Sequence, residues 1–187
     1  MRDPSSIKPA QSDPLPVTHG RVSLRRLVLA DLPTFQAYRQ DANVGRYQGW
    51  EPLSDRDAAQ FIAEMSGVAL FPQGEWIQLA IAESHTDRLI GDLGICVAKD
   101  GTSAEVGFTL ASAAQGVGFG TEAVKAAIRL IFEHTPVAQI LAVTDARNLP
   151  AQRLLERVNM RRVKTLAAVF KGQPCVEHVY AISRDGD

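Results

Sequence analysis

Three alternate glycines stand in the stretch Gln115-Gly116-Val117-Gly118-Phe119-Gly120-Thr121-Glu122-Ala123, directly before a strongly helical segment. Glycine lacks a Cβ, so each of these residues can adopt positive φ and let successive backbone N–H groups converge on one charged group. The helix that follows adds the positive end of its dipole. The stretch therefore predicts a cradle for an anion, and a phosphate is its natural ligand.

The sequence before the glycines predicts strands and short helices. Three strand-like runs lie at residues 76–83, 89–98 and 104–110. Asp100-Gly101 between the last two runs is typical of a hairpin turn. Further upstream, residues 21–29 alternate as a strand, and Asp31 is expected to cap a short helix. Ser54 with Asp57 resembles a capping box that opens another helix.

The sequence after the glycines completes a mixed sheet. Apolar residues recur at the spacing of a helix packed on a sheet, at Val124, Ala127, Ile128 and Ile131. A short apolar strand at 139–144, a helix opened by Asn148, and two strands around 171–174 follow. We therefore predict an α/β (α+β) fold, in which a mixed, mostly antiparallel sheet carries helices on both faces.

The length and composition bound the domain organisation. A chain of 187 residues with 45% hydrophobic and 22% charged residues can bury one sizeable core but not two. We expect this single domain over residues 21–184. Residues 1–20 combine several prolines with polar residues, so we expect a flexible N-terminal tail there.

The charge and the cysteines exclude several classes of function. A formal net charge of −1 and a pI of about 6.4 offer no field for gripping nucleic acid or an anionic membrane. Cys96 and Cys175 have no CxxC spacing, so we expect no metal site and a reducing cytosol. No stretch approaches the roughly 20 apolar residues that a membrane span needs. We therefore expect a cytoplasmic protein that binds neither nucleic acid nor membrane.

Two nucleotide-binding motifs compete for the glycines, beside a plain strand-to-helix turn. A Walker loop requires a lysine after its last glycine, but Thr121-Glu122 stands there. The dinucleotide fingerprint G-x-G-x-x-A is satisfied, and Asp145 ends the next strand, where a ribose-binding acid is expected. In that fold the first glycine closely follows its strand, whereas residues 111–117 separate Leu110 from Gly118. A dehydrogenase is therefore disfavoured.

The six residues from Gln115 to Gly120 match the signature Q/R-x-x-G-x-G/A, and the chain resembles the GNAT superfamily of acetyl-CoA-dependent N-acetyltransferases. Thr121-Glu122-Ala123 continues the match as in the branch that acetylates the N-termini of ribosomal proteins. The resemblance covers roughly residues 21–184. It implies acetyl-CoA as the cosubstrate, a protein N-terminus or a small amine as the acceptor, and a possible homodimer.

The resemblance also implies which residues bind the cofactor. Backbone N–H groups would hold its pyrophosphate at Gln115, Gly116, Val117, Gly118, Phe119, Gly120 and Thr121. The main chain around Phe108 to Leu110 would pair with the pantetheine arm and donate an N–H to the thioester oxygen. Asn148 would hydrogen-bond the arm, or cap its helix, or do both. Tyr47 and Trp50 would line the acceptor pocket, unless they are core residues.

Glu105 is the candidate base that removes a proton from the attacking amine. It shares one face of its strand with Gly107 and Thr109, opposite the apolar face. A carboxylate with a pKa near 4.3 is a weak base toward an ammonium, which favours relay through water. An ordinary solvated carboxylate is the alternative interpretation.

The chain departs from the family where a general acid is usual. Ala151 stands where the ribosomal-protein branch usually has a serine, and Leu155 stands where other branches have a tyrosine. These departures keep a second function open, namely a non-catalytic acyl-CoA-binding module or sensor.

Overall fold

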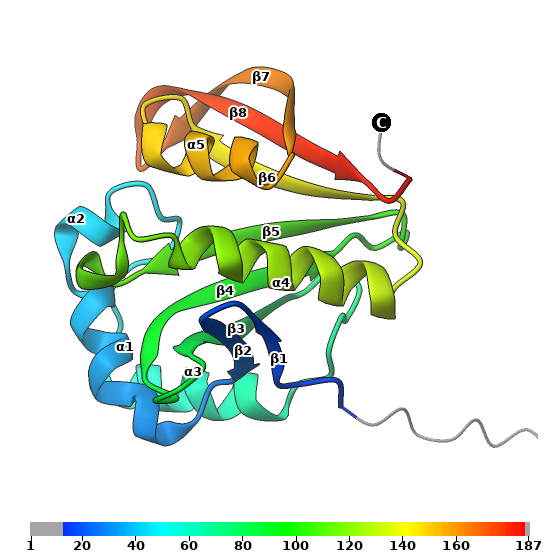
Figure 1. Ribbon diagram of the computed structural model, residues 1–187. Helices are drawn as coiled ribbons and strands as arrows, with labels where there is room; N and C mark the ends of the chain where they lie inside the picture. Colours follow the sequence, from blue (N-terminus) through cyan, green and yellow to red (C-terminus); the bar gives the residue numbers. More distant parts are fainter. Residues whose placement is uncertain (1–12, 186–187) are drawn as a thin grey trace, which may run out of the picture.

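Eight strands form one sheet in the computed structural model, which describes residues 13–185. Their order is β1-β2-β3-β4-β5-β6-β8-β7, and all neighbours are antiparallel except β5 and β6 (Figure 1). The strands are β1 Val17–His19, β2 Val22–Arg26, β3 Trp76–Glu83, β4 Leu89–Val97, β5 Ser103–Leu110, β6 Gln139–Asp145, β7 Arg161–Phe170 and β8 Gln173–Ser183. The predicted mixed, mostly antiparallel sheet is confirmed.

The sheet opens between its two parallel strands. β5 pairs with β6 only from Ser103 to Glu105, against Gln139 to Leu141. Beyond this point β5 continues to Leu110 and β6 continues to Asp145, and the two strands no longer pair. One edge of β5 and one edge of β6 are therefore left without a sheet neighbour. We call this the splay between β5 and β6.

Helices cover both faces of the sheet, as predicted. α4 (Phe119–His134) and α5 (Leu149–Arg157) pack on one face, and α4 crosses in front of the strands in Figure 1. The other face carries α1 (Leu32–Arg39), α2 (Ala42–Gly45) and α3 (Asp55–Gly67). β3 supplies both cores, because its residues point alternately to the two faces. Leu79 is buried beneath α4, and Ala80 is buried on the side of α1 and α3.

Local sequence signals explain several element ends. The Ser54 side chain accepts a hydrogen bond from the Asp57 N–H at 3.2 Å, which confirms the predicted cap of α3. Gly101 has a φ of 70° in the turn between β4 and β5, a conformation that favours glycine. The predicted limits of β3 are those observed, and those of the other strands differ by a few residues.

Asp31 holds the expected N-cap position of α1, but its side chain does not act as a cap. Its side chain makes no capping bond to α1 and instead closes the 3-10 turn η1 (Leu29–Asp31) by accepting from the Val28 N–H at 2.9 Å. The Arg25 guanidinium donates to both Asp31 carboxylate oxygens, at 2.8 and 2.9 Å. A buried carboxylate is stabilised best by such a charged partner, so the pairing with Arg25 overrides the local capping preference.

The expected tail extends too far. Residues 17–19 form β1, which pairs antiparallel with β2 after a turn in which Gly20 has a φ of 59°. The sheet therefore begins before residue 21, because the glycine lets the chain reverse direction and form one more ladder. Residues 1–12 of the expected tail lie outside the described residues.

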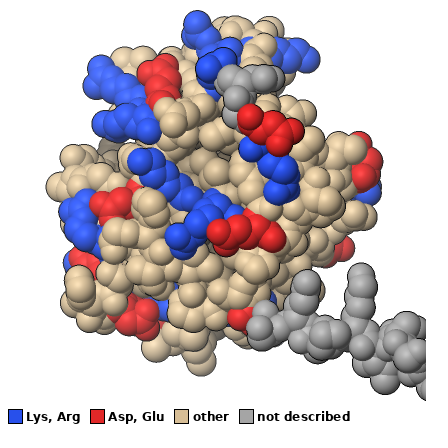
Figure 2. Space-filling view, turned by 45° about the vertical axis from the view of Figure 1, so that its right-hand side comes forward, with Lys and Arg blue, Asp and Glu red and all other residues tan. Residues whose placement is uncertain are grey.

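The charges on the surface are mixed. On the face that Figure 2 shows, Lys and Arg lie beside Asp and Glu on a mostly uncharged surface. No helix within residues 13–185 has the length and apolar character to cross a membrane.

Candidate cofactor and acceptor site

The glycine stretch forms the turn that leads into α4. Gly116 and Gly118 have φ angles of 78° and 99°, and Gly118 is the residue before the first turn of the helix. Gly120 already belongs to α4, so the expectation of positive φ is wrong for this glycine. A Cβ at Gly120 would lie 2.6 Å from Leu154 Cδ1 of α5. Gly120 therefore serves close helix packing, and the other two glycines shape the loop.

Backbone N–H groups converge at the start of α4. The Gln115 N–H donates to the Ser112 carbonyl at 3.2 Å, which removes it from the predicted set of anion-binding groups. Among the described residues, no backbone or side-chain acceptor is found for the N–H groups of Gly116 to Gly118. The N–H groups of Phe119 to Thr121 belong to the first helical turn, which has no preceding helical turn whose carbonyls could accept their hydrogen bonds. Six consecutive N–H groups, 116–121, thus remain for an anion.

Arg21, in the turn between β1 and β2, holds this loop in place through hydrogen bonds. Its guanidinium donates to the Val117 carbonyl at 2.9 Å, to the Glu122 carboxylate at 2.5 Å, and lies 4.6 Å from the Phe119 ring. The Arg21 backbone N–H also donates to Glu122, at 2.6 Å. Burial raises the pKa of the Glu122 carboxyl, but the hydrogen bonds and charge of Arg21 outweigh burial and hold that pKa below its usual value. Sequence reasoning missed Arg21, because nothing local links it to Glu122.

The outer edge of β5 faces the splay. The Ala111 N–H donates to the Ile90 carbonyl at 2.9 Å, which sets the alternation of the β4–β5 ladder. By that alternation, Phe108 and Leu110 direct their N–H and C=O groups away from β4. The Leu110 carbonyl accepts from Gln115 Nε2 at 3.0 Å, and the Phe108 carbonyl accepts from Gln48 Nε2 at 3.1 Å. The edge predicted to pair with an extended amide chain therefore has no strand beside it, and side-chain amides bind its two outward carbonyls.

Glu105 stands where the pairing of β5 and β6 ends. Ala104 and Val106 are buried beneath α4, so Glu105 lies on the other face of the sheet, as the strand alternation predicts. Its side chain is half-buried. Burial raises the pKa of the Glu105 carboxyl, and the nearby Glu177 carboxylate raises it further. No salt bridge to Glu105 is found within residues 13–185. Such a carboxylate is a better base than a solvated one.

The two predicted acceptor aromatics have different surroundings. Trp50 packs on the Arg39 guanidinium, 4.7 Å from its ring centre, and its indole N–H donates to Thr109 Oγ1 at 3.4 Å. The tryptophan therefore joins the core on this face to β5. Tyr47 lies 5.2 Å from the Arg46 guanidinium and is close enough to Arg147 to contribute to the raised pKa of that guanidinium. Tyr47 thus extends toward the end of β6.

A buried charged cluster lies behind Trp50, and sequence reasoning missed it. Asp92 of β4 and Arg39 of α1 form an ion pair with almost no exposure. Burial raises the pKa of Asp92, although the Arg39 charge and hydrogen bond oppose this. Arg39 also lies 4.5 Å from the centre of the Phe35 ring. One sign of this ion pair is present in the sequence, namely the single acidic residue within the apolar run of β4. An acid is rarely buried in such a run unless it is paired.

Asn148 and Asp145 lie near the end of β6. The Asn148 side chain accepts from the Ala151 N–H at 3.3 Å, so its capping role is confirmed and its cofactor role stays a prediction. Asp145 accepts from the Arg147 side chain at 2.9 and 2.6 Å and from its backbone N–H at 2.8 Å. This carboxylate is therefore occupied by its neighbour, which further weakens the dinucleotide interpretation.

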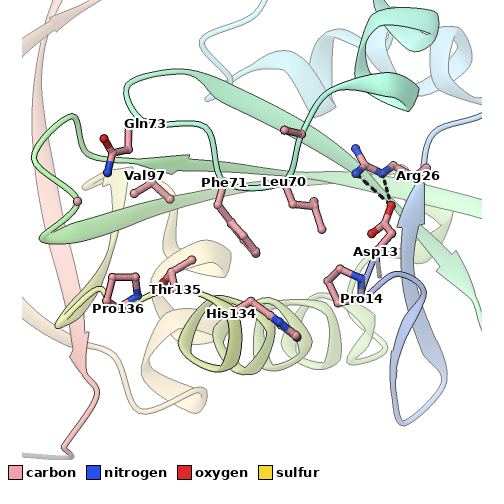
Figure 3. A pocket seen from close by; sticks show the side chains of 12 residues that line it. Asp13, Pro14, Arg26, Leu70, Phe71, Gln73, Val97, His134, Thr135 and Pro136 are labelled. Atoms are coloured by element: carbon pink, nitrogen blue, oxygen red, sulfur yellow. Dashed lines mark hydrogen bonds and ion pairs between the residues drawn. The ribbon is translucent and has the colours of Figure 1, made fainter. Parts of the chain in front are cut away.

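A cavity of about 500 Å³ lies at the far end of α4, away from the glycine loop. Figure 3 shows Phe71 and Leu70 on one side of it, His134 on the other, and the ion pair of Arg26 with Asp13, at 3.1 Å, near its rim. None of the predicted site residues lines this cavity. Within residues 13–185, no cluster of three or more His, Cys, Asp or Glu is arranged to hold a metal ion.

Comparisons with known proteins show the family of this chain. A family model described as an acetyltransferase (GNAT) domain matches residues 21–161. The protein named uncharacterized N-acetyltransferase p20 of Bacillus licheniformis is 27% identical over 168 residues, which cover 87% of this chain and 92% of the relative.

Solved structures share the fold. A GNAT-family acetyltransferase from Bacillus anthracis has a TM-score of 0.81 at 18% identity, covering 91% of this chain and 99% of that one. Spermidine N-acetyltransferase from Vibrio cholerae, with CoA and spermine, has a TM-score of 0.74 at 19% identity, covering 89% and 97%. RimL, a ribosomal L7/L12 alpha-N-protein acetyltransferase with coenzyme A, has a TM-score of 0.75 at 14% identity, covering 91% and 98%. The chain therefore belongs to the GNAT acetyltransferase family.

Proposed function

We propose that this protein transfers the acetyl group of acetyl-CoA to a primary amine, by direct attack of the amine on the thioester carbonyl. One observation carries the proposal: the N–H groups at 116–121, the open edge of β5 and Glu105 all border the splay between β5 and β6. These groups follow one another within residues 105–121, along β5 and the loop after it, and they would supply an anion site, a strand edge and a base.

The loop and the helix start fit the pyrophosphate of the cofactor. A Cβ at Gly116 would meet no atom within 4 Å, so this part of the loop is open to a ligand. Six N–H groups and the helix dipole together favour a multiply charged anion. Acetyl-CoA supplies an activated acetyl thioester when it is bound. The loop contributes proximity, and it takes no part in proton transfer.

The edge of β5 supplies the hydrogen-bond donors for the thioester oxygen. An outward N–H at Phe108 or Leu110 would stabilise negative charge on the thioester oxygen, because it is held rigidly by the β4–β5 ladder. Asn148 already accepts the Ala151 N–H with its side-chain oxygen, so its amide nitrogen is the part left to donate to the cofactor arm.

Glu105 would take the proton of the attacking ammonium, directly or through a water molecule. Its pKa is raised by burial and by Glu177, which narrows the gap to the pKa of an amine. An α-amine, with a pKa of about 7.7, is easier to deprotonate than a lysine-like amine at about 10.4. The acceptor is therefore a primary amine of a protein N-terminus or of a small molecule. The family likeness to both RimL and spermidine N-acetyltransferase supports these two classes.

The decisive experiment follows the release of free thiol from acetyl-CoA. Purified protein is assayed with a panel of N-terminal peptides, polyamines and aminoglycosides, and the proposal predicts thiol release with at least one of them. Binding of acetyl-CoA without thiol release in any reaction would contradict the proposal.

That contrary result would favour the second candidate, an acyl-CoA-binding module. Its specific support is the absence of the usual proton donors at residues 151 and 155. Leu155 is only 1% exposed and packs in the core beneath α5, so its position does not open onto the site. A catalyst with this sequence must therefore protonate the leaving thiolate from another group or from water.

A further inference from the structure

Gln48 occupies the strand edge that the proposed function assigns to the cofactor arm. Its Nε2 donates to the outward carbonyl of Phe108 at 3.1 Å, and its side chain is half-buried. The carbonyl belongs to the part of β5 that has no partner in β6. A side-chain amide therefore makes the kind of bond that an added strand would make.

A pantetheine arm carries amide N–H groups on an extended chain, so it pairs with a strand edge through the same carbonyls. The Gln48 amide and an amide of the arm would approach the Phe108 carbonyl from the same open side of β5. The two amide donors would compete for this one carbonyl and for the space beside it. Cofactor binding at this edge must therefore displace Gln48.

The displaced residue lies between the two predicted acceptor aromatics. The segment 45–51, which we call the acceptor loop, is also held at its end by Trp50, which packs on Arg39. Trp50 Nε1 donates to Thr109 Oγ1 at 3.4 Å, and Lys171 Nζ lies 3.4 Å from both the Gly45 carbonyl and the Glu51 carboxylate. The bond of Gln48 at 3.1 Å is shorter than these contacts. Its loss would free the middle of the loop.

We propose that Gln48 is a positioning residue that competes with the cofactor arm for the Phe108 carbonyl, so that cofactor binding releases the acceptor loop. This inference rests on the proposed function, because it needs the arm to use the edge of β5. The coupling is reciprocal. The hydrogen bond of Gln48 lowers the affinity for the cofactor, and binding of the cofactor in turn weakens the contact that holds the acceptor loop.

The test is a titration of the full chain with coenzyme A by calorimetry. Gln48→Leu keeps the size of the side chain but removes the donor, so we expect coenzyme A to bind about 2- to 10-fold more tightly, which is the weight of one net hydrogen bond. Gln48→Ala, which also vacates the path beside the strand, should tighten binding at least as much. The matched control is Gln60→Leu, which removes a glutamine donor to Glu64 on the exposed side of α3. It should leave the affinity unchanged.

The possible outcomes distinguish the role of Gln48 from the proposed function on which it rests. Local damage to the fold would weaken coenzyme A binding, so tighter binding in both Gln48 variants supports competition and not disruption. Equal or weaker binding in both variants, with wild-type protein binding normally, overturns the role of Gln48 and leaves the proposed function standing. Failure of the wild-type protein to bind coenzyme A overturns the proposed function, and the role of Gln48 falls with it.

Discussion

The cofactor side and the acceptor side of the proposed site use different kinds of chemical group. On the cofactor side, the groups predicted to act are backbone N–H and C=O groups of residues 116–121 and of β5. On the acceptor side they are side chains, namely Glu105, Tyr47 and Trp50, and their surroundings come from α1, β4 and β8. A backbone site is specified by local sequence, because glycine spacing sets the dihedral angles. A side-chain site is specified by packing between distant elements, which the sequence shows only indirectly.

The largest expected effect separates the chemistry from the binding. Glu105→Gln keeps the shape of the side chain but cannot accept a proton, so turnover should fall by about 100-fold or more. The dissociation constant of coenzyme A should stay within about twofold, because the cofactor groups lie on the backbone. Steady-state kinetics and calorimetry on the same preparation check both values. Unchanged turnover would remove Glu105 from the mechanism.

The next prediction compares two glycines of the loop. Gly118→Ala places a Cβ on a residue with a φ of 99°, and that Cβ would lie 3.1 Å from Arg21 Nη2. A strain of about 1–2 kcal/mol in the loop should weaken coenzyme A binding by about tenfold. Gly120→Ala has no such dihedral penalty but meets Leu154 at 2.6 Å. It should lower the free energy of unfolding by about 1–3 kcal/mol.

The two glycines are expected to differ, with Gly118 serving the cofactor loop and Gly120 serving helix packing. Calorimetry with coenzyme A and urea unfolding measure the two quantities separately. A Gly120→Ala variant that lost affinity at full stability would show that this glycine belongs to the cradle.

A smaller effect is expected from the brace on the cofactor loop. Arg21→Ala removes the bonds to Val117 and Glu122 but no predicted cofactor contact. The pair is partly exposed, with side-chain exposures of 52% and 20%, so its loss should weaken coenzyme A binding by only about two- to fivefold. The effect should diminish as salt is added, because salt screens exposed charges. An effect equal to that of Gly118→Ala would mean that Arg21 contacts the cofactor itself.

The smallest expected effect concerns stability on the acceptor side. The pKa of Glu105 is raised in the folded protein, so its ionised form opposes folding at any pH above that pKa. Glu105→Gln should therefore melt higher than the wild type at pH 8, on the order of 2 °C. The gain should shrink as pH falls toward about 4, where the carboxyl becomes protonated. Melting curves at a series of pH values check the sign, and a gain that grew toward acid pH would contradict it.

The parts that could be predicted were those with local causes. The hairpin at Gly101, the cap at Ser54 and the loop at Gly118 each depend on residues within a few positions of one another. β1 was missed because it is only three residues long and is held by distant elements, β2 and α4. The role of Gly120 was misassigned, because its close contact comes from Leu154 on another helix.

The candidate site, like the fold, was predictable where a feature depends on neighbouring residues in the sequence. Strand alternation is local, so the face of Glu105 followed from the sequence. The brace at Arg21, the ion pair of Arg39 with Asp92 and the bond of Gln48 to Phe108 all join segments that only the fold brings together. Periodicity and spacing carry no information about such pairs.

The central claim is that the cofactor is held by backbone groups along the splay. An amide NMR titration of this 20.3 kDa chain with coenzyme A tests it residue by residue. We expect the largest shifts at the N–H groups of 116–121, Phe108 and Leu110. Shifts concentrated instead around Leu70, Phe71 and His134, at the cavity beyond the far end of α4, would contradict it.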